Sequence, residues 1–264
     1  MLVALILELC IAVQAWWRPP SRWSRVKDFP FDLLLKVGDD RSAPEADTIR
    51  FVRANTSIPV PYVIVSDRAF GKTYMLMRKA EGVSLNSAWR TLDAEQRAEV
   101  VEQLRSFVAQ LRTLSPSLDC HHTVHAVCGL GNAPLIDSRI SSMPVGPFPD
   151  ECSFNDYLVF AARPYMDDTL LSSIRADMRD DHPIRFIHGD LAPRNIFVRG
   201  TVVTAVIDWE ESGWYPEYWE FVKALWAPLK DPDWLRAVRD IVGETFEEDW
   251  IVDRKLSDRM VGAF

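Results

Sequence analysis

The sequence predicts an α+β fold in which a small β-sheet region precedes a larger, mainly helical region. Short runs rich in Val, Ile, Tyr and Met at 59–65 and 73–77 indicate two neighbouring strands. The clearest helix is predicted for 93–114, where Asp93 and Gln96 fit a capping box. Its apolar residues recur at helical spacing: Val101, Leu104, Val108 and Leu111. Further helices are predicted for 44–52, 154–162, 168–178, 217–229, 231–242 and 244–252.

The most informative stretch is 186–210, where polar residues follow apolar runs rich in Ile and Val. This pattern predicts a strand, a tight loop, a strand, a turn and a strand. Asp190, Asn195 and Asp208 all lie at predicted strand ends, so their side chains can converge. Carboxylate and amide oxygens are hard ligands that suit Mg²⁺ bound to phosphates. His188 on its own is more often a structural histidine that hydrogen-bonds the backbone than a base.

The spacing is close to a pattern found in protein kinases. These use H-R-D-x-x-x-x-N for the catalytic loop and D-F-G for a second metal ligand. Here the first pattern is His188-Gly189-Asp190 with Asn195, and the second is Asp208-Trp209-Glu210. With Gly in place of Arg, H-G-D-L-x-x-x-N and I-D-W-E resemble the aminoglycoside phosphotransferase and choline kinase-like family. Within it, the run 214–220 resembles a fungal branch.

The resemblance is strongest over 186–228 and implies a protein kinase-like fold of two lobes. The family domain would span about 31–264, with a small β-sheet N-lobe at 31–80 and a mainly helical C-lobe at 81–264. Residues 1–30 would be an apolar N-terminal segment and linker. The implied activity is transfer of a phosphoryl group from ATP, with Mg²⁺, to a hydroxyl group of a small molecule.

The resemblance also assigns roles to single residues. Asp190 would be the catalytic base, and His188 would shape the catalytic loop. Asn195 and Asp208 would hold magnesium. Lys36, at the end of an apolar run over 31–38, would contact the nucleotide phosphates and be fixed by Glu45 at the start of the 44–52 helix. The backbone at the predicted hinge between the lobes would bind adenine, through Met77, Arg78, Lys79 and Ala80.

One departure from the family pattern is the missing glycine-rich hairpin before the lysine strand. Residues 18–35 contain no glycine, although a loop that covers phosphates needs close backbone approach. A catalytically impaired pseudokinase that still binds nucleotide is therefore an alternative. A metal-dependent hydrolase using His188, Asp190 and Asp208 would need further ligands at strand ends. A protein kinase would need an activation segment, for which there is little room after Asp208.

Composition excludes some partners. The formal net charge is -8 with a pI near 5.2 and no basic tract, so we expect no nucleic acid partner. Residues 1–17 are apolar but short for a membrane span and lack the features of a signal peptide. They fit a core or capping helix best; an interfacial anchor or a mis-set gene start is also compatible. The four cysteines form no disulfide framework, which favours a reducing, cytoplasmic location.

Two further patterns admit more than one interpretation. The segment 120–128 contains cysteines and histidines, but the spacing fits no closed zinc site well, and a surface loop is the simpler interpretation. Aromatic residues at 214–226 either pack a helix beneath the metal loop or line an acceptor pocket together with Glu217. The sequence leaves the identity of the acceptor and the oligomeric state open.

Overall fold

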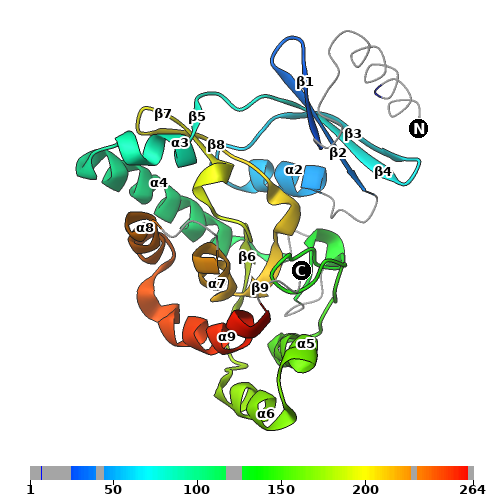
Figure 1. The fold of residues 1–264 in the computed structure, drawn as a ribbon. Coiled ribbons are helices and arrows are strands. Elements are labelled where there is room, and N and C mark those ends of the chain that lie inside the picture. Colours follow the sequence, from blue (N-terminus) through cyan, green and yellow to red (C-terminus); the bar gives the residue numbers. More distant parts are fainter. Residues whose placement is uncertain (1–6, 8–24, 40–44, 117–126, 227–230, 261–264) are drawn as a thin grey trace.

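A computed structural model describes residue 7 and residues 25–39, 45–116, 127–226 and 231–260, which form a small sheet lobe and a larger helical lobe (Figure 1). The two-lobed α+β architecture predicted from the sequence is confirmed. The N-lobe contains β1 (Val26–Phe29), β2 (Leu33–Asp39), α2 (Glu45–Asn55), β3 (Val63–Ala69) and β4 (Lys72–Arg78). These strands form one antiparallel sheet in the order β1-β2-β4-β3.

The register of this sheet places Lys36 at its centre. Lys36 is opposite Val26 on β1 and Met75 on β4. On the other face, Leu35 and Tyr74 are fully buried and pack with Leu7. The first strand lies within residues 1–30, so the sheet begins at Val26, before the expected start of the lobe at 31. Strand β3 starts only at Val63, because Pro59 and Pro61 cannot donate ladder hydrogen bonds.

The C-lobe is built mainly from helices that surround two small sheets. Its longer helices are α4 (Ala94–Thr113), α5 (Glu151–Ala162), α6 (Asp168–Asp177), α7 (Trp219–Trp226), α8 (Pro232–Val242) and α9 (Glu247–Met260). The short helices are α3 (Leu85–Ala88), η1 (Trp89–Thr91), η3 (Leu130–Asn132), η4 (Arg163–Tyr165), η5 (Pro193–Asn195), η6 (Trp209–Glu211) and η7 (Glu244–Phe246). The strands are β5 (Val83–Ser84), β6 (Ile184–Ile187), β7 (Ile196–Arg199), β8 (Val202–Val206) and β9 (Gly213–Pro216).

Helix α4 confirms its sequence prediction in detail. The Asp93 side chain accepts from the Gln96 N–H, and the Gln96 side chain accepts from the Asp93 N–H, which completes the capping box. All four predicted core residues of this helix are buried. Helix α9 extends to Met260, well beyond the expected end at 252, because Leu256 and Met260 pack into the core.

The strands of the 186–210 stretch belong to two different sheets. Strand β6 pairs antiparallel with β9, whereas β7 lies between β5 and β8. The loop from His188 to Asn195 therefore connects two sheets, and each sheet fixes one end of it. This arrangement gives the loop two rigid anchors.

Two predicted features lie outside the described residues. These are the apolar segment 1–17, apart from Leu7, and most of the cysteine- and histidine-containing segment 120–128. Cys128 itself is buried, whereas Cys152 is exposed. Among the helices of the described residues, none combines the length and apolar character required to cross a membrane.

Candidate active site

The loop that follows β6 is fixed by the ring of His188. Its Nε2 atom lies 3.0 Å from the carbonyl oxygen of Ile207, and its Nδ1 atom accepts a hydrogen bond of 3.1 Å from the N–H of Asp190. Since a carbonyl can only accept, the proton of the imidazole lies on Nε2. Both ring nitrogens are thus engaged, and His188 is placed to shape the loop rather than to take up a proton.

Asp190 and Asn195 lie next to each other across this loop. The Asn195 side-chain nitrogen donates to the Asp190 carboxylate at 2.7 Å and to the Asp190 carbonyl at 2.9 Å. Among the described residues, the Asn195 amide oxygen accepts no hydrogen bond, so it can face a ligand. Arg194 donates through Nη2 to both carboxylate oxygens of Asp190, at 2.6 and 2.7 Å. Arg194 was not predicted from the sequence, because an arginine in a loop resembles an ordinary surface residue.

Asp208 is brought to the same place through its neighbour Ile207. The Ile207 N–H donates to the Asn195 carbonyl at 2.8 Å, while the Ile207 carbonyl contacts His188. Asp208 has a left-handed backbone with φ of 66°, which turns the chain sharply after β8. The structure thus places Asp208 beside the loop of Asp190 and Asn195, as expected from the spacing.

The buried carboxylate of Glu220 on α7 holds the start of the loop from His188 to Asn195. It accepts hydrogen bonds from the N–H groups of His188 at 2.6 Å and Gly189 at 3.2 Å. Burial raises the pKa of Glu220, and the neighbouring His188 and these two N–H groups oppose the rise. Glu220 was not predicted from the sequence, because α7 carries both Glu220 and Lys223 and resembles an ordinary helix face.

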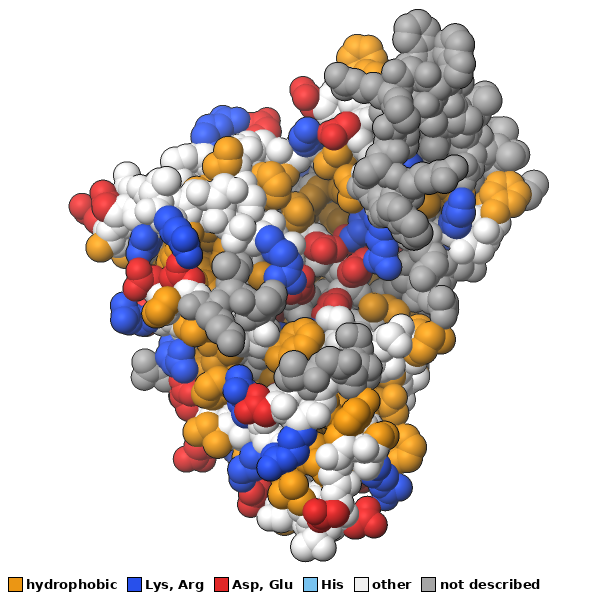
Figure 2. Space-filling view, viewed as in Figure 1, with side chains coloured by type: hydrophobic (Ala, Val, Ile, Leu, Met, Phe, Trp, Pro, Cys, Tyr) orange, Lys and Arg blue, Asp and Glu red, His pale blue; other side chains and the backbone are white. Residues whose placement is uncertain are grey.

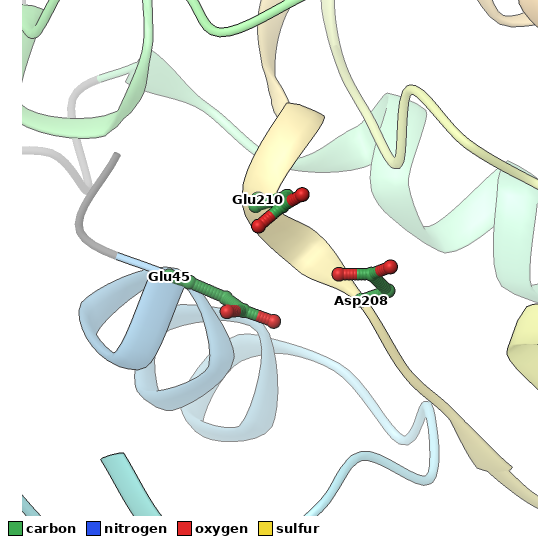
Figure 3. Close-up of side chains that lie close together, drawn as sticks. All are labelled: Glu45, Asp208 and Glu210. Atoms are coloured by element: carbon green, nitrogen blue, oxygen red, sulfur yellow. The ribbon is translucent and has the colours of Figure 1, made fainter. Parts of the chain in front are cut away.

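Lys36 is the centre of a charged cluster between the lobes. Its ammonium group lies 2.9 Å from Glu45, 2.6 Å from Asp208 and 3.3 Å from Glu210. Figure 3 shows that Glu45 projects from α2, whereas Asp208 and Glu210 come from the chain after β8. Acidic and basic side chains gather in the hollow between the lobes (Figure 2). The expected pairing of Lys36 with Glu45 is thus present, and it extends to Asp208.

The pKa values in this cluster follow from burial and from an excess of carboxylates. Burial alone would lower the pKa of Lys36, but the charges of Glu45, Asp208 and Glu210 outweigh it and raise that pKa. Burial is also the main reason why the pKa of Glu45 rises to about 7, with Asp208 and Glu210 adding to the rise and Lys36 opposing it. Three carboxylates around one ammonium leave a net negative site that attracts further cationic charge.

The residues expected to bind magnesium fit a divalent cation. Asp208 and Glu210 present carboxylate oxygens beside Glu45, and their ligand atoms all lie within 4.8 Å of one another. The Asn195 amide directs its nitrogen to Asp190, which leaves its oxygen for a ligand. Oxygen atoms of this kind suit Mg²⁺. Asp208 thus lies in a group of carboxylates that could hold a metal ion, together with Glu45 and Glu210.

At the hinge, part of the expected adenine-binding backbone is already used within the protein. The Arg78 N–H donates to Tyr62 at 3.0 Å, and the Lys79 N–H donates to Asp32 at 2.8 Å. Within the part of the chain that the structure describes, the N–H of Ala80 donates to no protein group. Of the N–H groups at Arg78, Lys79 and Ala80, that of Ala80 is therefore the one left for a ligand.

A second buried charge network, which was not predicted from the sequence, joins α7 to the segment that follows Asp208. Lys223 on α7 contacts Asp137 at 2.7 Å and pairs with Glu211. Burial alone would lower the pKa of Lys223, but Asp137 and Glu211 together raise it. Asp137 also accepts from the Trp219 ring N–H at 2.8 Å. This network fixes η6, which carries Glu210 and Glu211, to the helical lobe.

The aromatic residues after Glu211 belong to the core. Trp214, Tyr218 and Trp219 are buried, and the Trp219 ring contacts Phe154 and Tyr218. In this structure these three side chains pack within the core of the helical lobe. Trp226 is partly exposed at the end of α7. The idea of an acceptor pocket lined by Trp214, Tyr218 and Trp219 is therefore not supported by their positions.

Comparison with known proteins agrees with this geometry. The model of the phosphotransferase enzyme family matches residues 26–252. The chain belongs to this family. The family match begins at the first strand of the sheet and ends within α9, so it contains every residue of the site described above.

Relatives of known identity are distant in sequence. An aminoglycoside 3'-phosphotransferase from Enterococcus faecalis is 22% identical over 227 residues, covering 83% of this chain and 80% of the relative. A subtelomeric hrmA-associated cluster protein of Aspergillus fumigatus is 34% identical over 67 residues, which cover 24% of this chain and 13% of that protein.

Solved structures of phosphotransferases share the fold. The GDP and kanamycin complex of APH(2")-IIia has a TM-score of 0.59 at 15% identity and covers 93% of this chain and 86% of its own. An aminoglycoside-3'-phosphotransferase of type VIII has a TM-score of 0.54 at 17% identity, with coverages of 92% and 97%. At these identities the likeness shows the fold alone.

Proposed function

We propose that this chain transfers the γ-phosphoryl group of ATP to a hydroxyl group of a small molecule. The observation that carries the proposal is the cluster in which Lys36 joins Glu45 to Asp208, beside a loop that presents Asp190 and Asn195. This is the set of groups that phosphoryl transfer needs for positioning and for charge stabilisation. Nucleotide and small-molecule complexes among the neighbours that share the fold support the same conclusion.

In the proposed reaction, Asp190 accepts the proton of the acceptor hydroxyl. The hydroxyl oxygen forms a bond to the γ-phosphorus as the bond between that phosphorus and the β,γ-bridging oxygen breaks, and ADP leaves with the electron pair. Lys36, held by Glu45, orients the nucleotide phosphates. Magnesium, when bound through Asn195 and Asp208, supplies charge neutralisation at the phosphates. His188 and Glu220 keep the Asp190 loop in place, so little reorganisation is required during the reaction.

The first test is calorimetric titration of Mg-ATP into the wild-type protein and into Asp208→Ala. We expect magnesium-dependent binding in the wild type and its loss in the variant, because Asp208 is a proposed metal ligand. Absence of binding in the wild type at millimolar nucleotide would contradict the proposal.

The second test separates binding from transfer. Asp190→Ala should keep nucleotide binding, since Asp190 makes no contact with Lys36 or its cluster partners in the described structure. In an acceptor screen by ADP release, the same variant should lose at least about a hundredfold in rate, the contribution typical of a positioned base. Binding without transfer for any acceptor would favour the pseudokinase alternative, which the lack of glycine at residues 18–35 motivates.

A further inference from the structure

The segment before the lysine strand lacks the residue type that usually lets a backbone cover phosphates. Residues 18–35 contain no glycine, and the turn between β1 and β2 is built from Pro30, Phe31 and Asp32. Phe31 and Asp32 adopt positive φ values of 65° and 56° without being glycine. This turn lies at the hinge end of the sheet, because the Asp32 carbonyl accepts from the Lys79 N–H, whereas Lys36 is opposite Val26 at the other end of β1. Without glycine in this segment, side-chain groups near Lys36 are needed to bind the phosphates.

Arg25 is a cation at the end of β1 that lies beside Lys36. It directly precedes β1, and its carbonyl accepts a hydrogen bond of 2.7 Å from Val37 on the lysine strand. Its guanidinium nitrogen Nη1 lies 3.6 Å from one carboxylate oxygen of Glu210. The other oxygen of Glu210 lies 3.3 Å from the Lys36 ammonium. Glu210 thus lies between two cations, Lys36 on β2 and Arg25 just before β1.

We infer that Arg25 binds the phosphate groups of the nucleotide together with Lys36 and takes over the role of the missing glycine-rich loop. This inference rests on the proposed function. A guanidinium group is always charged and presents several N–H donors in one plane, which suits two phosphate oxygens at once. Backbone N–H groups of a loop would supply the same hydrogen bonds with less charge. One arginine is therefore a chemically adequate replacement.

The geometry fits a ligand-binding role better than a structural one. The Arg25 side chain is 63% exposed, and its distance to Glu210 exceeds a hydrogen bond, so the pair contributes little to folding. The remaining guanidinium nitrogens make no ion pair with the described residues. When nucleotide phosphates enter beside Lys36, Arg25 can turn from Glu210 to them without breaking a hydrogen bond.

The test compares nucleotide affinities of Arg25→Gln with those of a matched control. Arg236→Gln removes the same charge from another exposed arginine, on α8, which pairs with Asp233 at 3.4 Å. Calorimetry is run with Mg-ATP, Mg-ADP and adenosine. We expect Arg25→Gln to weaken Mg-ATP and Mg-ADP about tenfold, as for the loss of a charge-assisted hydrogen bond, and to leave adenosine unchanged. Arg236→Gln should leave all three affinities unchanged.

The alternative outcomes are distinct. Equal weakening of adenosine would mean that the substitution acts through the structure of the lobe, and equal affinity for Mg-ATP in Arg25→Gln and wild type would mean that Arg25 does not touch phosphates. Either result overturns the inference while the proposed function stands, because wild-type binding of Mg-ATP is still observed. If the wild type binds no Mg-ATP, the proposed function itself fails.

Discussion

At the scale of single residues, Gly189 explains why the loop motif contains Gly where protein kinases have Arg. Its backbone has a φ of 80°, which favours glycine. A Cβ atom at this position would lie 2.2 Å from the carbonyl oxygen of Glu211. The Asp190 loop and the chain after Asp208 therefore pack backbone to backbone. Gly189, which distinguishes this motif from that of protein kinases, is thus required by packing in the structure.

This close contact gives a stability prediction. Gly189→Ala should destabilise the protein by about 3 kcal/mol, because it adds backbone strain and a collision with a backbone atom that cannot easily move. The control is Gly200→Ala, where φ is 62° but no atom lies within 4 Å of the added Cβ. This control should lose about 1 kcal/mol from strain alone. Urea unfolding of both variants measures the difference, and equal losses would show that the contact with Glu211 is unimportant.

At the scale of elements, α7 is the helix that organises the active site. Seven of its residues, Trp219 to Leu225, are buried, and they include the charged Glu220 and Lys223. Glu220 fastens the start of the Asp190 loop, and Lys223 holds η6 through Glu211. The helix thus fixes two of the segments that carry the proposed chemistry relative to each other. A buried charge is costly unless it is paired, so both residues depend on these contacts.

The role of Glu220 can be tested by Glu220→Gln. The variant keeps the shape of the side chain but loses the negative charge that accepts two N–H groups. We expect phosphoryl transfer to slow about tenfold, because hydrogen bonds to a charged group are lost, while Mg-ATP affinity stays the same. Glu248→Gln, at an exposed position of α9, is the control and should transfer at the wild-type rate. Single-turnover ADP release measures both, and an unchanged rate in Glu220→Gln would argue against positioning of the loop by α7.

At the scale of the whole molecule, His182 connects three segments of the C-lobe. Its Nδ1 atom lies 2.7 Å from Glu151 at the start of α5, and its Nε2 atom lies 3.4 Å from Asp249 on α9. Its ring also packs against Tyr218, just before α7. Burial would lower the pKa of His182, but contacts with Asp249 and Glu151 outweigh burial and raise the pKa to about 9. The imidazolium is thus part of the packing of the helical lobe.

This raised pKa predicts how stability depends on pH. The folded state binds the His182 proton more tightly than the unfolded state, whose pKa is 6.5. The stabilisation is therefore complete below pH 6.5 and is lost as the pH rises through about 9. Its size is on the order of 3 kcal/mol. Urea unfolding between these pH values should show a fall in stability that is absent in His182→Gln, and parallel slopes in the two proteins would contradict the assignment.

Sequence and structure agree most closely where local patterns decide the outcome. The capping box of Asp93 and Gln96 fixes the start of α4, and the apolar run around Lys36 forms β2. The spacing of Asp190, Asn195 and Asp208 predicted a common site because Asp190 and Asp208 each come after a strand and Asn195 directly precedes one. In contrast, Glu220 and Lys223 looked like parts of an ordinary helix face. Their partners are up to 86 residues away in the sequence, so no local pattern predicts these contacts.

The sequence by itself determined the α+β architecture, the loop residues and the pairing of Lys36 with Glu45, because spacing and periodicity act over short distances or follow a family pattern. Only the tertiary structure decided that β6 and β7 belong to different sheets, that Arg194 contacts Asp190, and that Arg25 approaches Glu210. Strand partners and ion pairs depend on which segments meet in space. Burial then sets the strength of each contact, since charges removed from water interact strongly only with the partners that folding brings to them.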